Sequence, residues 1–142
     1  MKILFVCGGN TCRSPMAEVI FRNLCKRRGR KDIFVSSAGA AVEAGLPVID
    51  DTYVALKSCG ETIGRRKKSA VQFKPSMIYE YDLIITMTKF VKRFIGDFEN
   101  VKTLDEVAGC GDILDPFGYP IDVYIEVCKK LQKSMEVLYN KT

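Results

Sequence analysis

Near its start the chain carries a cysteine and an arginine separated by five residues, in the segment Cys7–Arg13. A cysteine thiolate is a strong nucleophile, and an arginine guanidinium presents donors that match two oxygens of a phosphoryl group. A loop of this length can arc around one tetrahedral anion, and Gly8 and Gly9 permit the close approach that the arc needs. Asn10 tolerates a left-handed backbone, and its amide could brace the loop. The spacing indicates an anion pocket that contains its own nucleophile.

The flanking sequence supplies the elements that must hold such a pocket. Residues 3–6 form a short apolar run typical of a buried strand, and Ser14 and Pro15 are expected as the N-cap and first turn of a helix. Where a strand leads into a helix, backbone N–H groups converge beside the positive helix end and bind anions. Ser14 could also hydrogen-bond the Cys7 sulfur and favour the thiolate. The predicted chemistry is phosphoryl transfer to Cys7, and an inert buried cysteine is the alternative.

A second pair with the same spacing, Cys59 and Arg65, lacks this context. No apolar strand precedes it, no capped helix follows it, and Arg66 stands where a hydroxyl is expected. We therefore interpret the second pair as coincidental.

The run VCGGNTCRSPMAE, residues 6–18, resembles the signature C-x-G-N-x-C-R-S-P of the low-molecular-weight protein phosphatases. Two later segments also fit, so the resemblance covers essentially the whole chain, residues 1–142. It implies a single α/β domain with a doubly wound four-stranded parallel sheet of order 2-1-3-4 and helices on both faces. It also implies phosphorylated protein substrates, a cysteinyl-phosphate intermediate and inorganic phosphate as the product. The residues that it assigns to phosphate binding are Gly8, Gly9, Asn10, Thr11, Cys12, Arg13 and Ser14.

The leaving group must receive a proton, and Asp115 is the candidate donor. An Asp-Pro turn is by itself an ordinary loop feature, but the resembled family has its general acid in an Asp-Pro pair followed by an aromatic residue. Here that motif is Asp115-Pro116-Phe117, in which Phe117 could wall the substrate, and Asp112 is expected to be a solvated neighbour. The expected catalytic residues are then Cys7, Arg13 and Asp115. No metal and no cofactor are expected, because the guanidinium and the loop amides supply the positive charge.

The resemblance also implies side chains that brace the loop asparagine. The matching serine, Ser37, ends a short predicted strand at residues 33–37 and leads into an Ala-Gly corner. The family commonly has a histidine in the region of residues 61–80 that supports the same asparagine, and this chain has Lys68 there instead. An ordinary strand-end hydroxyl is the alternative for Ser37.

Two residues of the loop bear on substrate choice and redox control. In tyrosine-acting members of the family, the residue after the loop asparagine is typically a branched aliphatic. In the arginine-acting bacterial branch it is threonine, as Thr11 is here, and the acid loop tends to read D-P-F-G, as residues 115–118 do. The resemblance therefore favours phosphoarginine over phosphotyrosine, with Thr11 and Phe117 as the specificity residues.

Cys7 and Cys12 lie at the two ends of one tight loop and are expected to form a disulfide when the protein is treated with peroxide. The alternative is that Cys12 is a small buried side chain that only fills space.

Apolar runs and helical periodicity predict further strands and helices that alternate along the chain. Strands are expected at residues 83–87 and 101–104. One helix is expected to begin at Ser14 and Pro15 and to end at Gly29, and a second to run from Pro47 to Gly60. Two more are expected, one after residue 87 and one that begins near Pro120. The expected core faces of the last two helices are Val91, Phe94, Ile95 and Phe98, and Tyr124, Cys128, Leu131, Met135 and Leu138. This alternation predicts a parallel sheet whose ligand site lies beyond the carboxyl ends of its strands.

The composition, 142 residues of which 47% are hydrophobic, is typical of one globular domain. Six cysteines are irregularly spaced and there is no histidine, so we expect reduced thiols and no zinc site. No apolar run has the length of a membrane span and no signal peptide is recognisable, which predicts a cytoplasmic protein without a membrane partner. The net charge of +5 includes basic clusters at residues 26–31 and 65–68, interpreted as solvated surface rather than as a nucleic-acid site.

Other functions share some of these features. An arsenate reductase has the same fold and loop, but it needs resolving cysteines in a flexible middle segment, and residues 60–109 contain none. A phosphate-binding module without catalysis would keep Arg13 but has no use for Cys7 together with Asp115. A phosphotyrosine-specific phosphatase is the alternative within the resembled family.

Overall fold

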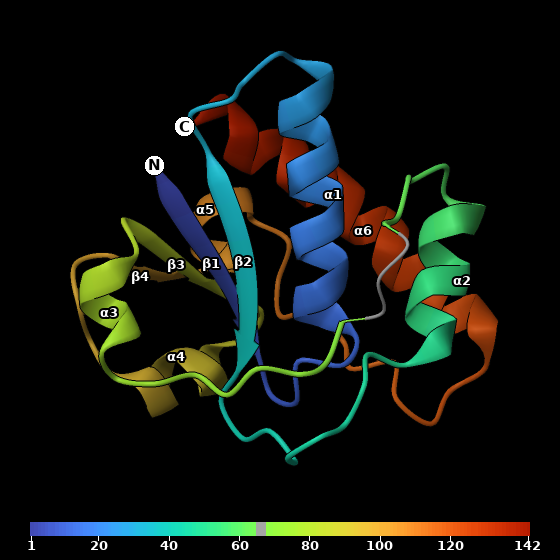
Figure 1. Cartoon of the computed structure of the whole chain (residues 1–142), viewed down its shortest axis with the longest axis horizontal. Helices are drawn as coiled ribbons and strands as arrows, with labels where there is room; N and C mark the ends of the chain where they lie inside the picture. Colours follow the sequence, from blue (N-terminus) through green and yellow to red (C-terminus); the bar gives the residue numbers. More distant parts are fainter. Residues whose placement is uncertain (65–67) are drawn as a thin grey trace.

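The computed structural model describes residues 1–64 and 68–142 and contains a four-stranded parallel sheet (Figure 1). The strands are β1 (Lys2–Cys7), β2 (Phe34–Gly39), β3 (Leu83–Thr86) and β4 (Val101–Thr103). Their order is β2-β1-β3-β4, which confirms the predicted topology. Because β1 is central, its apolar run is buried on both faces. Cys7 pairs with Gly39 and Val6 pairs with Thr86, so the carboxyl ends of these strands meet at one edge, the lower end of the sheet in Figure 1.

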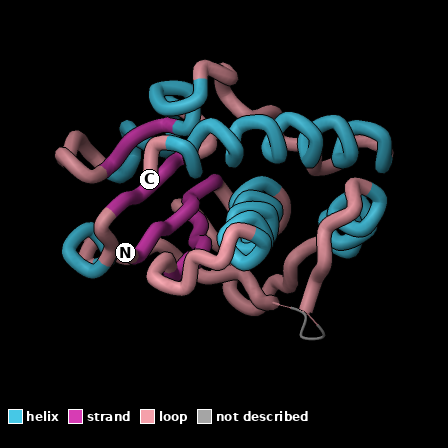
Figure 2. The backbone as a smooth tube through the Cα atoms, turned by 90° about the horizontal axis from the view of Figure 1, so that it is seen from above, coloured by secondary structure: helices cyan, strands magenta, loops and turns pink. Residues whose placement is uncertain are grey.

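Helices cover both faces of the sheet, as Figure 2 shows. The helices are α1 (Arg13–Arg27), α2 (Asp50–Ser58), α3 (Met77–Glu80), α4 (Lys89–Ile95), α5 (Leu104–Ala108) and α6 (Ile121–Asn140). Side chains of β1 alternate between two cores. Ile3 and Phe5 pack with α1, α2, α5 and α6, whereas Leu4 and Val6 pack with α3 and α4. Two cores on opposite faces of one sheet confirm the predicted α/β class.

The predicted core stripe of the last helix is correct. All five of its residues are buried in α6: Tyr124, Cys128, Leu131, Met135 and Leu138. The helix is 20 residues long, so its apolar period repeats often enough to define one face. No helix in the parts of the chain described is both long and apolar enough to cross a bilayer.

The predicted core face of α4 is half right. Val91 is buried and Ile95 packs against the same core, but Phe94 is 60% exposed and Phe98 is 38% exposed. The helix ends at Ile95, because Gly96 follows with a φ of 115°, and Phe98 lies beyond it. A helix of seven residues offers too few repeats for its buried face to be identified from periodicity.

Several predicted element boundaries also differ, and three of the differences have a clear physical cause. α1 begins at Arg13 with Cys12 as N-cap, since the Ser14 side chain turns inward instead of capping the helix. α2 begins at Asp50 rather than at Pro47, because residues 47–48 pair with residues 68–69. β4 ends at Thr103, whose hydroxyl caps α5. Arg65, Arg66 and Lys67 lie outside the described residues, so the interpretation of the Cys59–Arg65 pair as coincidental stays a prediction.

Candidate active site

The loop of residues 8–12 joins β1 to α1 at the carboxyl end of the central strand. The corner that follows β2 packs against this loop, and Ala40 N donates to the Cys7 carbonyl at 2.9 Å. Gly39 lies so close that an added Cβ would come within 2.7 Å of Gly8 O. A side chain at residue 39 would therefore displace the loop, which explains the glycine in this corner.

Cys7 lies at the base of the loop, and its side chain is buried. The Asn10 backbone N–H donates to Cys7 Sγ at 3.3 Å, and Ser14 Oγ lies 2.9 Å from the same sulfur. A thiolate only accepts hydrogen bonds, so in that state the Ser14 hydroxyl is the donor. Both contacts then stabilise negative charge on the sulfur.

Arg13 and Asp115 face each other beside the loop. The Arg13 side chain is only 11% exposed, and its Nη1 donates to the Ile113 carbonyl at 3.1 Å. Asp115 Oδ2 lies 3.6 Å from Arg13 Nη2, and Asp115 Oδ1 accepts from Phe117 N at 3.1 Å. Because the Asp115 side chain is 55% exposed, this ion pair is weak and the carboxyl group remains open to a substrate.

The segment around Asp115 is anchored at both of its ends. Pro116 is buried, whereas Phe117 is exposed next to it. Asp112 is exposed, and its Oδ1 also accepts from Lys89 N at 3.0 Å. Asp112 therefore fastens the segment to the start of α4, a role that its solvated position alone did not indicate.

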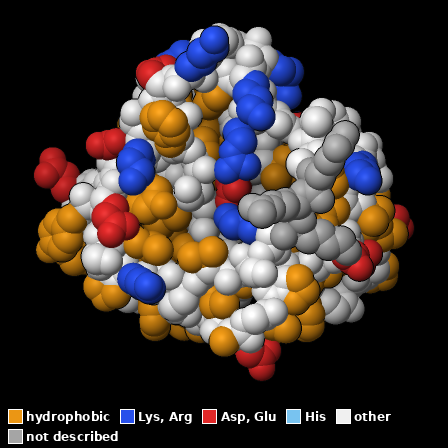
Figure 3. All heavy atoms as spheres, in the orientation of Figure 1, with side chains coloured by type: hydrophobic (Ala, Val, Ile, Leu, Met, Phe, Trp, Pro, Cys, Tyr) orange, Lys and Arg blue, Asp and Glu red, His pale blue; other side chains and the backbone are white. Residues whose placement is uncertain are grey.

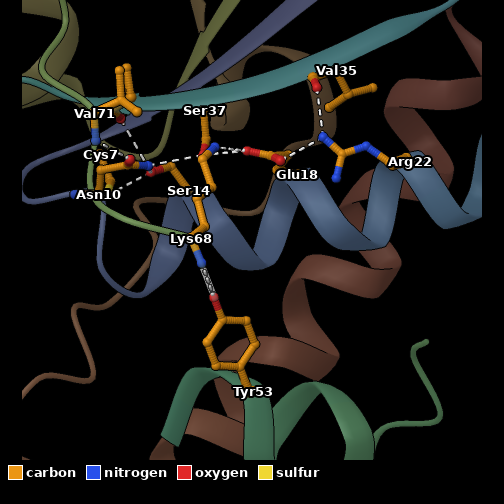
Figure 4. Close-up of polar contacts among 11 residues, drawn as sticks. Cys7, Asn10, Ser14, Glu18, Arg22, Val35, Ser37, Tyr53, Lys68 and Val71 are labelled. Carbon is orange, nitrogen blue, oxygen red and sulfur yellow. Dashed lines mark hydrogen bonds and ion pairs between the residues drawn. The ribbon is translucent and has the colours of Figure 1, made fainter. Parts of the chain in front are cut away.

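Asn10 is the centre of a buried polar network (Figure 4). Its backbone is left-handed, with a φ of 55°. Asn10 Nδ2 donates to Ser14 Oγ at 2.8 Å and to Ser37 Oγ at 3.0 Å. Asn10 Oδ1 accepts from Val71 N at 2.9 Å. The amide thus connects the loop to α1, to β2 and to the segment that follows residue 68.

Glu18 and Lys68 complete the network behind Ser37. Ser37 Oγ donates to Glu18 Oε1 at 2.6 Å, and Lys68 Nζ donates to Ser37 Oγ at 3.0 Å and to the same Glu18 oxygen. Arg22 Nη2 donates to the other oxygen, Glu18 Oε2, at 2.5 Å. Burial acts to raise the pKa of Glu18, but Lys68, Ser37 and Arg22 together hold that pKa below its usual value. Glu18 is therefore a carboxylate at neutral pH.

The chain is similar to known phosphatases over nearly its whole length. The sequence pattern of the family described as low molecular weight phosphotyrosine protein phosphatase matches residues 2–142. The chain belongs to this family. Its curated relatives are named phosphatases as well. A protein-arginine-phosphatase of Bacillus subtilis is 32% identical over 146 residues, covering 97% of this chain and 94% of that protein. The low molecular weight protein-tyrosine-phosphatase PtpB of Staphylococcus haemolyticus is 35% identical over 136 residues, covering 92% of each.

Solved structures of phosphatases share the fold over nearly the full length. A YwlE arginine phosphatase mutant with a phosphorylated active-site serine gives a TM-score of 0.87 at 32% identity, covering 99% of this chain and 95% of that one. A low molecular weight protein tyrosine phosphatase from T. tengcongensis gives a TM-score of 0.87 at 33% identity, covering 100% and 99%. The chain is therefore a phosphatase of the low-molecular-weight family.

In this phosphatase the loop residue Thr11 is held through its backbone. The Thr11 carbonyl accepts from Ile49 N at 3.1 Å and from Thr52 Oγ1 at 2.9 Å. The first turn of α2 thus supports the loop of residues 8–12, the candidate phosphate loop. This role of Thr52 was not predicted from the sequence, because a threonine among apolar residues at helical spacing gives no sign of which distant carbonyl it will contact.

Cys12 is buried beside α6, where its Sγ donates to Tyr124 OH at 3.8 Å. Burial raises the pKa of the Cys12 thiol, and hydrogen bonds to Tyr124, Thr11 and Thr52 offset that effect only in part. The thiol therefore stays protonated at neutral pH. Tyr124 was predicted as part of the core stripe of α6, and its contact with Cys12 depends on how that helix packs against the loop.

Proposed function

We propose that this phosphatase removes phosphate from phosphoarginine in proteins through a covalent cysteinyl-phosphate. Cys7 is the nucleophile, Arg13 and the loop amides bind the phosphoryl oxygens, and Asp115 is the general acid. The observation that carries the proposal is the setting of the Cys7 sulfur, which receives hydrogen bonds from a loop amide and from a serine hydroxyl. Such a setting favours a thiolate, the form that attacks phosphorus.

In the first step the Cys7 thiolate attacks phosphorus in line, and the bond from phosphorus to the substrate nitrogen breaks. Asp115 gives its proton to that nitrogen as it leaves, so the arginine side chain is released. Arg13 and the backbone amides of the loop stabilise the three equatorial oxygens of the transferring group. The carboxyl of Asp115 is half exposed and lies within 3.6 Å of the guanidinium, which supports its access to the same substrate.

In the second step a water molecule attacks the phosphorus of the cysteinyl-phosphate. Asp115, now a carboxylate, accepts a proton from that water, and the bond between phosphorus and sulfur breaks. The sulfur leaves as a thiolate, stabilised by Ser14 and by the Asn10 amide, and inorganic phosphate is released.

The choice of phosphoarginine has two supports. Relatives from Bacillus subtilis and Geobacillus stearothermophilus, 32% and 34% identical, are named protein-arginine-phosphatases. The chain also has Thr11 after the loop asparagine, where a hydroxyl suits a polar guanidinium better than a flat phenyl ring. Phosphotyrosine is the second candidate, favoured by the PtpB relative at 35% identity. A cytoplasmic location stays a prediction from the sequence.

The roles are tested with Cys7→Ser and Asp115→Asn on phosphoarginine peptides. Cys7→Ser should abolish turnover and still bind vanadate, since Arg13 and the loop amides are intact. Asp115→Asn should lower kcat by about 10²- to 10⁴-fold, the usual contribution of a positioned acid. Asp112→Asn is the matched control, because an asparagine oxygen can still accept from Lys89 N, and its kcat should stay near that of the wild type.

Substrate class is measured in the same assay by the ratio of kcat/KM for phosphoarginine and phosphotyrosine peptides. A ratio above one supports the proposal, and a ratio below one identifies a tyrosine phosphatase. Near-wild-type turnover by Cys7→Ser or Asp115→Asn would refute the assigned roles. Thiol-dependent reduction of arsenate without peptide turnover would instead assign the chain to the reductase class.

A further inference from the structure

Two cysteines that belong to neither β1 nor the phosphate loop lie against each other where α2 meets α6. Cys59 is the C-cap of α2, and Cys128 belongs to the buried stripe of α6. Figure 1 shows α2 beside the first half of α6, and the two helices share one core. The reaction proposed above uses neither sulfur, so their proximity has no role in it.

Two contacts hold Cys59 across the turn of α6 that carries Cys128. Cys59 Sγ donates to the Ile125 carbonyl at 4.0 Å, and Gln132 Nε2 donates to the Cys59 carbonyl at 3.0 Å. Ile125, Cys128 and Gln132 are spaced by three and four residues, so they share one face of the helix. At a rise of about 1.5 Å per residue, Cys128 lies near the middle of the span that Cys59 bridges. A helix carbonyl points toward the C-terminus, so a sulfur at Ile125 O lies close to the level of Cys128.

The two thiols are also in direct contact with each other. Burial raises the pKa of the Cys128 thiol far above its usual range, and a side-chain hydrogen bond with Cys59 raises that pKa further. Cys128 is completely buried, whereas Cys59 is partly exposed and is followed by the exposed Gly60. A reagent from solution therefore reaches Cys59 first, while Cys128 stays protonated behind it.

We propose that Cys59 and Cys128 form a dithiol that low-molecular-weight disulfides, such as oxidised glutathione, convert to a disulfide joining α2 to α6. Cys59 is the sulfur that reacts with the small disulfide, and Cys128 is the sulfur that resolves the product. The site is a reversible modification site outside the phosphate loop. The inference does not depend on the proposed function, because neither thiol belongs to the loop.

The conversion consists of two thiol–disulfide exchange steps. The Cys59 thiolate attacks one sulfur of the small disulfide, and the other half leaves as a thiolate. Cys128 then loses its proton to water, and its sulfur attacks Cys59 Sγ as the bond from Cys59 to the glutathione half breaks. Two cysteines are oxidised, and one small disulfide is reduced to two thiols. The second step should be the slower one, because Cys128 must first lose a proton.

The charges around Cys59 suit an anionic reagent such as oxidised glutathione, which carries several carboxylates. Lys57, two residues before Cys59, is exposed. Figure 3 shows Lys and Arg side chains gathered over α1, the helix that shares a core with α2. Glu61, just beyond the cysteine, is buried, and Arg27 Nη1 lies 3.7 Å from its carboxylate. The net charge of +5 acts in the same direction.

The disulfide connects the two helices that support the phosphate loop. The first turn of α2 holds the Thr11 carbonyl, and Tyr124, one turn before Cys128 in α6, contacts Cys12. A bond between residues 59 and 128 closes a chain segment of about 70 residues, and such a cross-link lowers the conformational entropy of the unfolded chain. Oxidation at this site should therefore stabilise the folded protein with both supports in place.

The pairing is tested by mass mapping of the full chain after incubation with oxidised glutathione at about pH 8, near the usual pKa of a thiol. Free thiols are blocked with iodoacetamide, and the protein is digested without reduction. The wild type should give the Cys59 peptide joined to the Cys128 peptide, and Cys59→Ser should not. Trypsin leaves Cys110 and Cys128 on one peptide, so Cys110→Ser is the matched control and should keep the cross-link. In Cys128→Ala, Cys59 should instead carry one glutathione.

The effect on stability is measured in a Cys7→Ser background, because Cys7 would react with the same reagent. Oxidation should raise the unfolding temperature of Cys7→Ser by roughly 5–10 °C, and dithiothreitol should reverse the rise. The double variant Cys7→Ser/Cys59→Ser should show no rise.

A wild-type Cys59 that stays free, keeps its glutathione or joins a cysteine other than Cys128 overturns the inference. A cross-link that leaves the unfolding temperature unchanged overturns the claim that it strengthens the contact between α2 and α6. If Cys128→Ala fails to fold, the partly exposed Cys59→Ser and its Cys110→Ser control still decide the pairing. Failure of the proposed function is a separate result, because the mapping detects thiols and not turnover.

Discussion

At the scale of single residues, Thr11 is anchored through its backbone while its side chain is nearly free. Its carbonyl receives two hydrogen bonds from the start of α2, and within the described part of the chain its hydroxyl has one polar contact, with Cys12 Sγ at 3.8 Å. The side chain can therefore change without loss of the loop conformation. This makes residue 11 a suitable place to test substrate choice.

We expect Thr11→Ile to lower phosphoarginine turnover and to raise phosphotyrosine turnover, because a larger apolar side chain packs better on a phenyl ring than on a guanidinium. The ratio of the two kcat/KM values should change by roughly tenfold, within the 1–3 kcal/mol that one apolar contact contributes to discrimination. Thr52→Val is the matched control. It removes a bond to the Thr11 carbonyl, so it should lower both activities together and leave their ratio unchanged.

Cys12 is the second residue whose environment makes a specific prediction. Hydrogen peroxide should oxidise the Cys7 thiolate first, because burial keeps the Cys12 thiol protonated. That reaction gives a sulfenic acid at Cys7, and attack by Cys12 sulfur then forms the disulfide and releases water. Mass mapping of the oxidised protein should find Cys7 joined to Cys12, and dithiothreitol should restore activity.

The variant Cys12→Ser should lose activity irreversibly under the same peroxide treatment, as Cys7 proceeds to the sulfinic and sulfonic acids. Cys110→Ser, outside the loop, should behave as the wild type does. A disulfide from Cys7 to any other cysteine, or full recovery of Cys12→Ser, would contradict the pairing.

At the scale of elements, the phosphate loop is held by segments that are distant in sequence. The stretch after residue 68 pairs with the corner that follows β2: Gly39 N donates to the Val71 carbonyl and Phe73 N donates to the Gly39 carbonyl, both at 2.8 Å. This pairing brings Lys68 to Glu18 on α1 and Val71 to Asn10. Helix α1 therefore serves two purposes, since its N-terminus directly follows the loop and its second turn carries the Glu18 carboxylate that pairs with Lys68.

The Glu18 carboxylate makes acid stability depend on this contact between α1 and the segment at residue 68. Its folded-state pKa lies below the usual value of 4.5, held there by Lys68, Ser37 and Arg22 against the opposing effect of burial. As pH falls from about 5 through 4.5, the unfolded chain binds a proton at Glu18 before the folded chain does. The stabilisation is thus complete above 4.5 and is lost as pH falls through the folded-state pKa.

We expect the free energy of unfolding of the wild type to decline more steeply below pH 5 than that of Glu18→Gln, which carries no titrating group at residue 18. Urea unfolding at a series of pH values measures both slopes. Glu136→Gln, which removes an exposed partner of Arg28, is the control and should retain the wild-type slope. Parallel curves for the wild type and Glu18→Gln would refute the assignment.

At the scale of the whole molecule, the central strand β1 contributes side chains to both cores and also carries Cys7 at its end. β1 sends alternate side chains to opposite faces and ends at Cys7, the proposed nucleophile, which packs in the core shared with α1 and α6. The net charge of +5 on the whole chain favours the approach of anionic substrates. The sheet edge and this charge together suit the proposed binding of a phosphoryl group by the loop.

The sequence determined the parts of this protein that are encoded locally. Three features are examples: the buried strand before Cys7, the glycines of the loop and the 20-residue α6. Each is predicted by residue types that lie close together in the sequence, and the structure has each where it was expected. Short elements contain too few residues for their periodicity to identify the buried face or the cap. The buried face of α4 was predicted only in half because seven residues contain barely two turns, and the α1 cap was misplaced because Ser14 had a stronger partner in the core.

Only the tertiary structure decided which distant side chains meet the loop. Thr52 and Tyr124 look like ordinary members of apolar helix faces, and Val71 contributes a backbone N–H that no side-chain pattern could reveal. The resemblance put Lys68 in the region of the family's bracing histidine, but nothing in the sequence indicated that it pairs with Glu18, 50 residues away in the chain. The physical reason is that these contacts depend on strand order and helix docking, which the summed burial of both cores determines. Residues near one another in sequence specify the chemistry of the loop, and the packing of the whole sheet specifies what supports it.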